Sequence, residues 1–319
     1  MRQLVKLTLI LLISVGSYGL AESSEPFTIG LSVWSGYPRS VDGFKAGLAE
    51  AGLIENQHIR FMAGNSGGDK NKQQSVATTF KDAKVDLVYS LTTPGTAIIK
   101  KVVPDTTPIV FSIVTYPADS GLIESFEYSG NNLVGTSNFV PYAHYVSLLN
   151  KILPEARTVA IFHRKSEPNS KIQATNLRRI LTRQGLEVSI QTPTSLDEVK
   201  SMAQSVVASK VDVLITTTDT LMQSGGENIL IDISLANGVP ILSSNKAGIE
   251  AGATFGPVAD FYTLGKMSGQ MAANILLNKV SPSSISSQWQ NPPQYLVNKS
   301  SFKKLKINLP SGLNFVYAE

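Results

Sequence analysis

The chain has 319 residues and no Cys, with 28 Lys and Arg against 24 Asp and Glu. This length suggests two domains, and a composition of 42% hydrophobic and 16% charged residues is sufficient for a sizeable buried core. The absence of Cys excludes a disulfide scaffold, a thiol redox site, a Cys-zinc site and a lipid-modified Cys anchor, and three His leave little for a His-rich metal site. A net charge of +4 gives no argument for binding nucleic acid or an anionic membrane surface.

Residues 1–21 have the pattern of a secretory signal peptide. Arg2 and Lys6 supply the positive start, an apolar run follows at 7–15, and small residues precede a cleavage site after Ala21. A membrane anchor is the alternative, but the run is shorter than the ~20 residues that span a bilayer. We therefore expect an exported protein, free in a periplasm, from which residues 1–21 have been removed.

Apolar runs alternate with helical spacing through the rest of the chain. In the first half we expect strands at 27–33, 59–63, 85–91 and 108–114, and helices at 40–51, at 69–81 and from Pro94 onward. In the second half we expect strands at 158–163, 186–191, 211–216 and 239–243, and helices at 170–184, 195–208 and 221–236. A last helix is expected at 261–277.

The two halves echo each other in sequence. Lys84-Val85-Asp86 returns as Lys210-Val211-Asp212, and two further strand sequences and a helix end recur at offsets near 130 residues. Continuous β-branched runs between helices indicate parallel strands covered on both faces. The fold class is therefore α/β, with two doubly wound, Rossmann-like lobes around a central cleft.

In such sheets, ligands bind beyond the carboxyl ends of the strands. The residues that follow the strands are mostly hydroxyls, amides and aromatics, which suit a small polar ligand. The candidates selected in this way for ligand binding are Trp34, Ser35, Thr93, Pro94, Thr115, Tyr116, Glu167, Asn169, Ser170, Asp219, Thr220 and Asn245.

Catalytic motifs are absent from the sequence. There is no GxGxxG or GxxxxGK[ST] phosphate loop and no GxSxG elbow, and His163 has no obvious acidic partner. Without a nucleophile–base pair or a metal set, we expect no enzyme activity, no catalytic residue, no metal and no cofactor.

Asp219 is the most informative acid, because it follows a predicted buried strand. One interpretation is a partner for a ligand ammonium group; the other is the cap of the helix that follows. Asn169 and Ser170 open a helix, where backbone N–H groups could hold a ligand carboxylate or simply form an ordinary cap.

Several short motifs carry a resemblance to a known family. They are Thr93-Pro94 after a strand, Val114-Thr115-Tyr116-Pro117, Gly130-Asn131 through Asn138, Glu167-Pro168-Asn169-Ser170, Thr218-Asp219-Thr220, Gly252-Ala253 and Tyr262-Thr263-Leu264-Gly265. Over nearly all of its mature length the chain resembles the ABC-transporter substrate-binding proteins of the tryptophan/tyrosine-binding type. This resemblance adds Asn138 to the candidate ligand-binding residues.

The resemblance implies a type I periplasmic binding protein fold. Lobe 1 would comprise residues 25–138 and 257–288, and lobe 2 residues 139–256 and 289–319, with crossovers near 138–141, 255–258 and 286–293. The family usually has acids where this chain has Tyr116, Asn138 and Asn245, so a less cationic ligand is possible.

The expected function is therefore capture of a small polar ligand, such as an amino acid, and its delivery to the membrane permease of an ABC importer. The alternative is a ligand-sensing subunit for a membrane kinase or nucleotide cyclase. The family default is a monomer.

Overall fold

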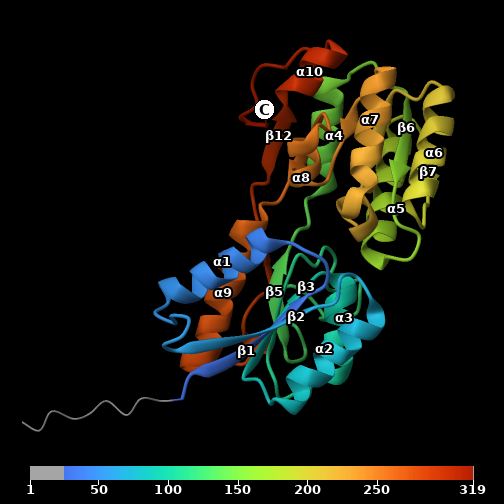
Figure 1. The fold of residues 1–319 in the computed structure, drawn as a ribbon. Helices are drawn as coiled ribbons and strands as arrows, with labels where there is room; N and C mark the ends of the chain where they lie inside the picture. Colours follow the sequence, from blue (N-terminus) through green and yellow to red (C-terminus); the bar gives the residue numbers. More distant parts are fainter. Residues whose placement is uncertain (1–24, 319) are drawn as a thin grey trace, which may run out of the picture.

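The computed structural model describes residues 25–318, and the predicted signal peptide at 1–21 lies outside the described residues. The chain forms two α/β lobes that are joined by three connections (Figure 1). Each lobe has a mostly parallel sheet with helices on both faces, as the alternation of apolar strands and amphipathic helices predicts.

The first lobe has a six-stranded parallel sheet in the order β11-β5-β4-β3-β1-β2. Its strands are β1 (Phe27–Val33), β2 (Ile59–Asn65), β3 (Leu87–Leu91), β4 (Ile109–Ser112), β5 (Leu133–Ser137) and β11 (Gln288–Trp289). Helices α1 (Pro38–Glu50) and α9 (Phe261–Asn278) cover one face, and α2 (Lys70–Asp82) and α3 (Thr93–Val102) cover the other.

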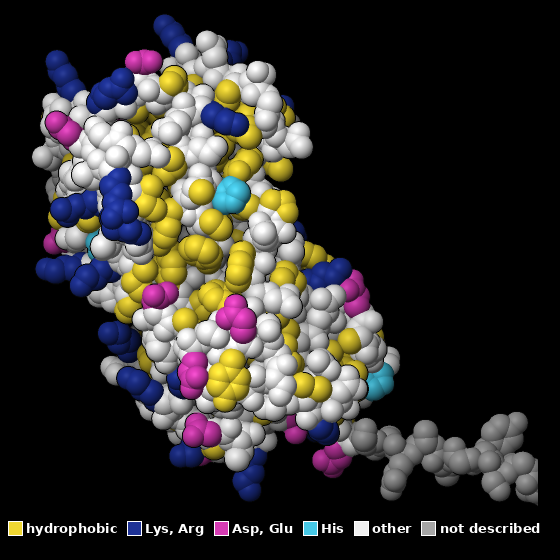
Figure 2. Space-filling model, turned by 180° about the vertical axis from the view of Figure 1, so that it is seen from behind, with side chains coloured by type: hydrophobic (Ala, Val, Ile, Leu, Met, Phe, Trp, Pro, Cys, Tyr) yellow, Lys and Arg dark blue, Asp and Glu magenta, His cyan; other side chains and the backbone are white. Residues whose placement is uncertain are grey.

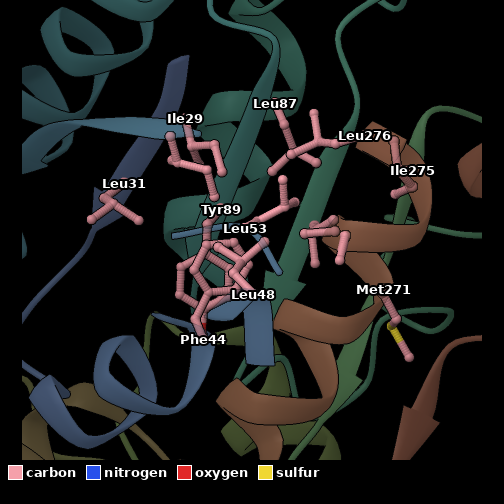
Figure 3. Close-up of a cluster of buried hydrophobic side chains, with 14 of the residues drawn as sticks. Ile29, Leu31, Phe44, Leu48, Leu53, Leu87, Tyr89, Met271, Ile275 and Leu276 are labelled. Atoms are coloured by element: carbon pink, nitrogen blue, oxygen red, sulfur yellow. The ribbon is translucent and has the colours of Figure 1, made fainter. Parts of the chain in front are cut away.

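Helix α9 returns from the second half of the chain to pack on α1. The two helices approach closely through glycines: a Cβ on Gly43 would lie 2.1 Å from the carbonyl oxygen of Tyr262, and one on Gly265 would lie 2.0 Å from that of Ser40. Beneath them the rings of Phe44 and Tyr89 stack 3.8 Å apart in the core drawn in Figure 3. The last predicted helix therefore belongs to the first lobe.

The second lobe has a seven-stranded sheet in the order β13-β12-β10-β9-β8-β6-β7, in which only the β10–β12 pair is antiparallel. Its strands are β6 (Thr158–Phe162), β7 (Glu187–Gln191), β8 (Val213–Thr216), β9 (Ile241–Leu242), β10 (Phe255–Val258), β12 (Gln294–Asn298) and β13 (Phe315–Ala318). Helices α4 (Tyr142–Ile152), α5 (Pro168–Arg183) and α10 (Lys299–Leu305) lie on one face, and α6 (Leu196–Ala208), α7 (Glu227–Asn237) and α8 (Lys246–Ala251) on the other.

The three connections between the lobes differ in part from the expected positions. The first lies at 138–141 as expected, between β5 and α4. The second lies at 259–260 and not at 255–258, because residues 255–258 form β10 of the second sheet. The third is limited to 290–293, because Gln288 and Trp289 pair with β5 of the first sheet. The lobe boundaries expected after residues 256 and 288 therefore shift, because residues 257–258 belong to the second sheet and Trp289 to the first.

Aromatic side chains pack around these connections. Phe139, in the first connection, has its ring centroid 5.6 Å from that of Tyr116, 6.0 Å from that of Tyr142 and 6.4 Å from that of Trp289. Figure 2 shows hydrophobic side chains along the junction of the lobes on this face. The hinge is therefore an apolar, well-packed region.

Two further features differ from the expected elements. The structure has β5 and α4 between residues 114 and 158, where no strand or helix was expected. The helix expected at 221–236 is interrupted by a kinked turn at Met222–Gly226 (η1), in which Gly225 has φ +116°. This left-handed backbone conformation favours glycine and separates the turn from α7.

Candidate functional site

A small cavity lies between the lobes at the carboxyl ends of the strands. Its lining comes from both lobes and consists of Tyr37, Thr92, Thr93, Pro94, Ile113, Thr115, Asn138, Glu167, Asn169, Thr218, Asp219, Thr220 and Gln223. We call this space the inner cavity. Thr115 Oγ1 and Thr218 Oγ1 are 3.2 Å apart across it, so the lobes are in contact. Its volume of about 10 Å³ is close to that needed by one water molecule, so a larger ligand requires the lobes to separate.

Two buried carboxylates dominate the inner cavity. Glu167 is 5% exposed and Asp219 is 1% exposed. Burial, together with the charge of Glu167, raises the pKa of Asp219 to about 7. Glu167 accepts hydrogen bonds from Arg164 Nη1 at 3.0 Å, from the Thr220 backbone N–H at 3.1 Å and from the Thr220 hydroxyl. The cavity therefore has a negative wall that is only partly neutralised by Arg164.

The local sequence explains where these acids lie. Glu167 immediately precedes α5, whose first residue is Pro168, a residue well suited to the first helical turn. Asp219 follows β8, and its carboxylate accepts from the backbone N–H of Met222 at 2.8 Å and of Arg164 at 3.0 Å. Asp219 thus caps the turn after β8, as one interpretation predicted, and it also lines the inner cavity.

Several buried polar atoms around the cavity have no hydrogen-bond partner among residues 25–318. From the first lobe these are Thr93 Oγ1 and Asn138 Oδ1; from the second they are Asn169 Oδ1 and Arg164 Nε. Buried polar atoms are nearly always paired in folded proteins. Three of these atoms, on Thr93, Asn138 and Asn169, belong to lining residues and can accept a hydrogen bond from a molecule placed between the lobes.

Other predicted residues lie apart from the inner cavity. Ser170 Oγ donates to the carbonyl oxygens of Arg164 and Glu167, so its hydroxyl stabilises the loop at 164–170. Trp34 is only 2% exposed and contacts the start of α3 near Gly95. Tyr116, expected among the ligand-binding residues, lies instead at the hinge, where its hydroxyl is 2.6 Å from that of Tyr142.

Ser35 and Asn245 line a neighbouring cavity of about 360 Å³, which we call the outer compartment. It also lies between the lobes, and its other lining residues are Gly36, Tyr37, Pro38, Arg39, Gln223, Ser224, Lys246, Ala247 and Phe261. Tyr37 and Gln223 line both spaces. The inner cavity and the outer compartment therefore adjoin.

Three lining residues of the inner cavity were not expected from the sequence, namely Tyr37, Ile113 and Gln223. Thr92 and Thr218 follow strands and lie within the ranges that the strand-end rule points to. Gln223 carries no such signal, because it falls inside an expected helix. Only the Gly225-Gly226 pair hinted that this helix is interrupted.

The described residues show neither a metal cluster nor a membrane-spanning helix. Across residues 25–318, no three His, Asp or Glu side chains gather in a way that could hold a metal ion. Within the same range, no helix has the length and apolar character needed to cross a membrane.

Comparisons with known proteins agree with this architecture. The chain is 28% identical over 299 residues to a tyrosine-binding protein from Clostridioides difficile (strain R20291), covering 93% of this chain and 86% of that protein. A ligand-free, open substrate binding protein with adhesive properties from Clostridium difficile is 28% identical, with a TM-score of 0.73 over 91% of this chain and 98% of that one. An ABC domain in complex with L-Trp from Streptococcus pneumonia is 24% identical, with a TM-score of 0.83 over 90% and 96% of the two chains.

The neighbours share the two-lobed type I periplasmic binding protein fold. The family model for ABC transporter substrate binding proteins matches residues 35–318, which is most of the described chain. This protein therefore belongs to the ABC transporter substrate binding protein family.

Proposed function

We propose that this protein captures an amino acid between its lobes and delivers it to the permease of an ABC importer. The observation that carries the proposal is the pair of buried carboxylates, Glu167 and Asp219, in the wall of the inner cavity. Two carboxylates in a low-dielectric site repel each other, and a cation placed between them relieves that repulsion.

An amino-acid backbone fits the polar atoms of this site. Its ammonium group has three N–H donors, which match the carboxylates and the unpartnered oxygens of Thr93 and Asn138. Its carboxylate requires donors, which we assign to the backbone N–H groups at the N-terminus of α5, where Asn169 lines the cavity.

Binding requires movement of the lobes, since the inner cavity holds only about one water molecule when they are in contact. We propose that the ligand enters an open form and that closure about the three connections at 138–141, 259–260 and 290–293 encloses it. The closed form would then dock on the permease.

The relatives support an amino-acid ligand. One is named a tyrosine-binding protein, and a structural neighbour holds L-Trp. Proteins of this family are extracellular or periplasmic. We propose a periplasmic monomer for this chain, released after cleavage of residues 1–21, with no catalytic activity of its own.

Mass spectrometry of small molecules released by denaturing the purified mature protein tests this proposal. We expect an amino acid in near-stoichiometric amount, or an amino acid that raises the melting temperature when it is added to ligand-depleted protein. Release of a sugar or a nucleoside, with no thermal shift from any amino acid, would contradict the proposal.

A further inference from the structure

Charge is distributed unevenly over the second lobe. Helices α4 and α5 contain five Lys and Arg and no Asp or Glu. Helices α6, α7 and α8, which cover the opposite face of the same sheet, contain five Asp and Glu against two Lys. The modest net charge of the chain, +4, therefore conceals a lobe with one basic face and one more acidic face.

The five cations of α4 and α5 are all exposed. They are Lys151, Lys171, Arg178, Arg179 and Arg183, and we call them the basic face. Side chains four and seven positions apart share one side of a helix, so the four cations of α5 form a stripe of about 18 Å along its outer surface. Asn150 Nδ2 donates to Gln184 Oε1 at 3.4 Å, which brings the end of α4, and Lys151 with it, beside the end of α5. Figure 2 shows Lys and Arg side chains gathered at one side of the second lobe.

Within the described part of the chain, no carboxylate neutralises the basic face. None of its five side chains forms an ion pair among residues 25–318, and Arg179 Nη2 donates only to a neutral amide oxygen, Asn176 Oδ1, at 3.5 Å. Arg179 and Arg183 are one helical turn apart, a spacing at which like charges destabilise a helix. The basic face thus carries a repulsion that an anionic partner would relieve.

The composition of the basic face favours a membrane surface over a protein. A protein interface has an apolar core that is rich in aromatic residues. The large hydrophobic side chains that are exposed among residues 25–318 do not lie on α4 or α5; they are Ile54, Tyr128, Leu196, Leu277, Leu309, Val316 and Tyr317. Attraction to an anionic bilayer needs only Lys and Arg spread over a surface. A bilayer of anionic phospholipid is therefore the partner that fits.

The basic face is separate from the ligand site. None of its five side chains lines the inner cavity or the outer compartment. All five belong to the second lobe, so opening or closing of the cleft leaves their arrangement unchanged. A contact through this face would therefore hold one lobe and leave the other free to move.

We propose that the basic face holds the protein at a bilayer surface rich in anionic phospholipid. The lipid phosphates would neutralise Arg178, Arg179 and Arg183, whose guanidinium groups are well suited to phosphate. This attachment goes beyond ligand capture, because it keeps the protein near the membrane whether or not a ligand is bound. It is reversible and weakens with salt, since each exposed Lys or Arg strengthens binding only roughly fivefold.

Co-sedimentation with lipid vesicles tests the proposal. The mature protein is mixed with vesicles of equal parts phosphatidylglycerol and phosphatidylcholine, or of phosphatidylcholine alone, at about 0.1 M salt. We expect it to pellet with the anionic vesicles only, and to be released at about 1 M salt, where the Debye length falls to about 3 Å. The triple variant Arg178→Gln, Arg179→Gln, Arg183→Gln should bind the anionic vesicles at least about 30-fold more weakly.

A triple variant on α2 is the matched control. Lys70→Gln, Lys72→Gln and Lys81→Gln remove three exposed cations from a helix of the first lobe and change the net charge equally. This control should bind within about threefold of the native protein, because its altered side chains lie away from the basic face. Replacing the same three arginines of α5 with Lys should also keep most of the binding, because the charge is retained. A thermal melt of each variant shows that it is folded, and we expect native melting temperatures because the altered side chains are exposed.

Three results would overturn the proposal. The first is a native protein that does not pellet with the anionic vesicles. The second is an equal loss of binding in the α2 control, which would show that net charge, and not the basic face, attracts the protein to the vesicles. The third is capture of the native protein, but not of the α5 Gln variant, by immobilised poly-L-glutamate in the absence of vesicle binding, which would identify an acidic protein as the partner.

Discussion

Replacing Asp219 with Asn separates the two interactions of this side chain. Asn is as good a helix cap as Asp, so the bond to the Met222 N–H at 2.8 Å can be kept while the charge is lost. If Asp219 pairs with a ligand ammonium, removing one partner of such a buried charged pair costs ~2–5 kcal/mol, or roughly 30- to 5000-fold in affinity. If it serves only as a cap, affinity stays unchanged.

The substitution also alters contacts within the protein. Asp219 Oδ2 accepts from the Arg164 N–H at 3.0 Å and from the Thr217 hydroxyl at 2.9 Å, and an amide NH2 group at that position cannot accept. We therefore expect a loss of about 1–3 kcal/mol in unfolding free energy, partly offset by relief of the repulsion with Glu167. Denaturant titration measures this change separately from affinity.

Asp69→Asn is the matched control. Asp69 caps α2 with a bond of 2.8 Å to the Lys72 N–H, but it is exposed and lies outside the inner cavity. Calorimetry with the ligand recovered from the purified protein should show native affinity for Asp69→Asn and a loss of at least about 30-fold for Asp219→Asn. An affinity within twofold of native in a folded Asp219→Asn protein would refute the role of Asp219 as the ammonium partner.

Four further outcomes are expected. The pKa of Asp219 is raised to about 7, so a bound proton must leave before an ammonium group can pair with this carboxylate. Ligand affinity should therefore rise from pH 5 to about pH 7 and then level off. Calorimetry should show a flatter pH profile for Asp219→Asn. The same raised pKa of Asp219 stabilises the ligand-free fold at low pH, and this stabilisation should be lost as pH rises from about 4 through about 7. If the unfolding free energy of Asp219→Asn had the same pH dependence as that of the native protein, the raised pKa of Asp219 would be contradicted. Gly265→Ala places a Cβ 2.0 Å from the Ser40 carbonyl oxygen, so the unfolding free energy should fall by ~1–3 kcal/mol, and a native melting temperature would show that the α1–α9 packing adjusts freely. Tyr142→Phe removes the 2.6 Å contact with the Tyr116 hydroxyl at the hinge and so changes the balance between open and closed forms. Ligand affinity should then change several-fold although no ligand contact is lost, and fluorescence titration can measure this change.

The alternation of strands and helices could be read from the sequence where apolar runs were continuous. Strands such as β3 and β8 are buried on both faces and contain only apolar or small polar residues, so their pattern is clear. By contrast, β5 reads Leu-Val-Gly-Thr-Ser, with two large apolar residues and a glycine that meets the Phe111 backbone. Its strand character comes from its neighbours β4 and β11, which a local pattern does not contain.

The site was predictable in part for a similar reason. Thr93, Thr115 and Asp219, which lie two or three positions after a strand, were expected at the cleft and do line it. Gln223 lines the cleft from the kinked turn that contains Gly225, and its amide donates to Asn245 Oδ1, features that a helical pattern does not predict. Trp34 also follows a strand, yet it is buried against the start of α3, since position after a strand does not fix side-chain direction.

Binding of an amino acid compared with its N-acetyl derivative tests the central claim most directly. Acetylation removes the ammonium charge but leaves the carboxylate and the side chain unchanged. With the amino acid that binds the mature protein most tightly, we predict that calorimetry detects binding of the free form and a loss of at least about 30-fold for the N-acetyl form, because Glu167 and Asp219 are then left without their cation. Equal affinity for the two forms would show that the buried carboxylates do not recognise the ligand.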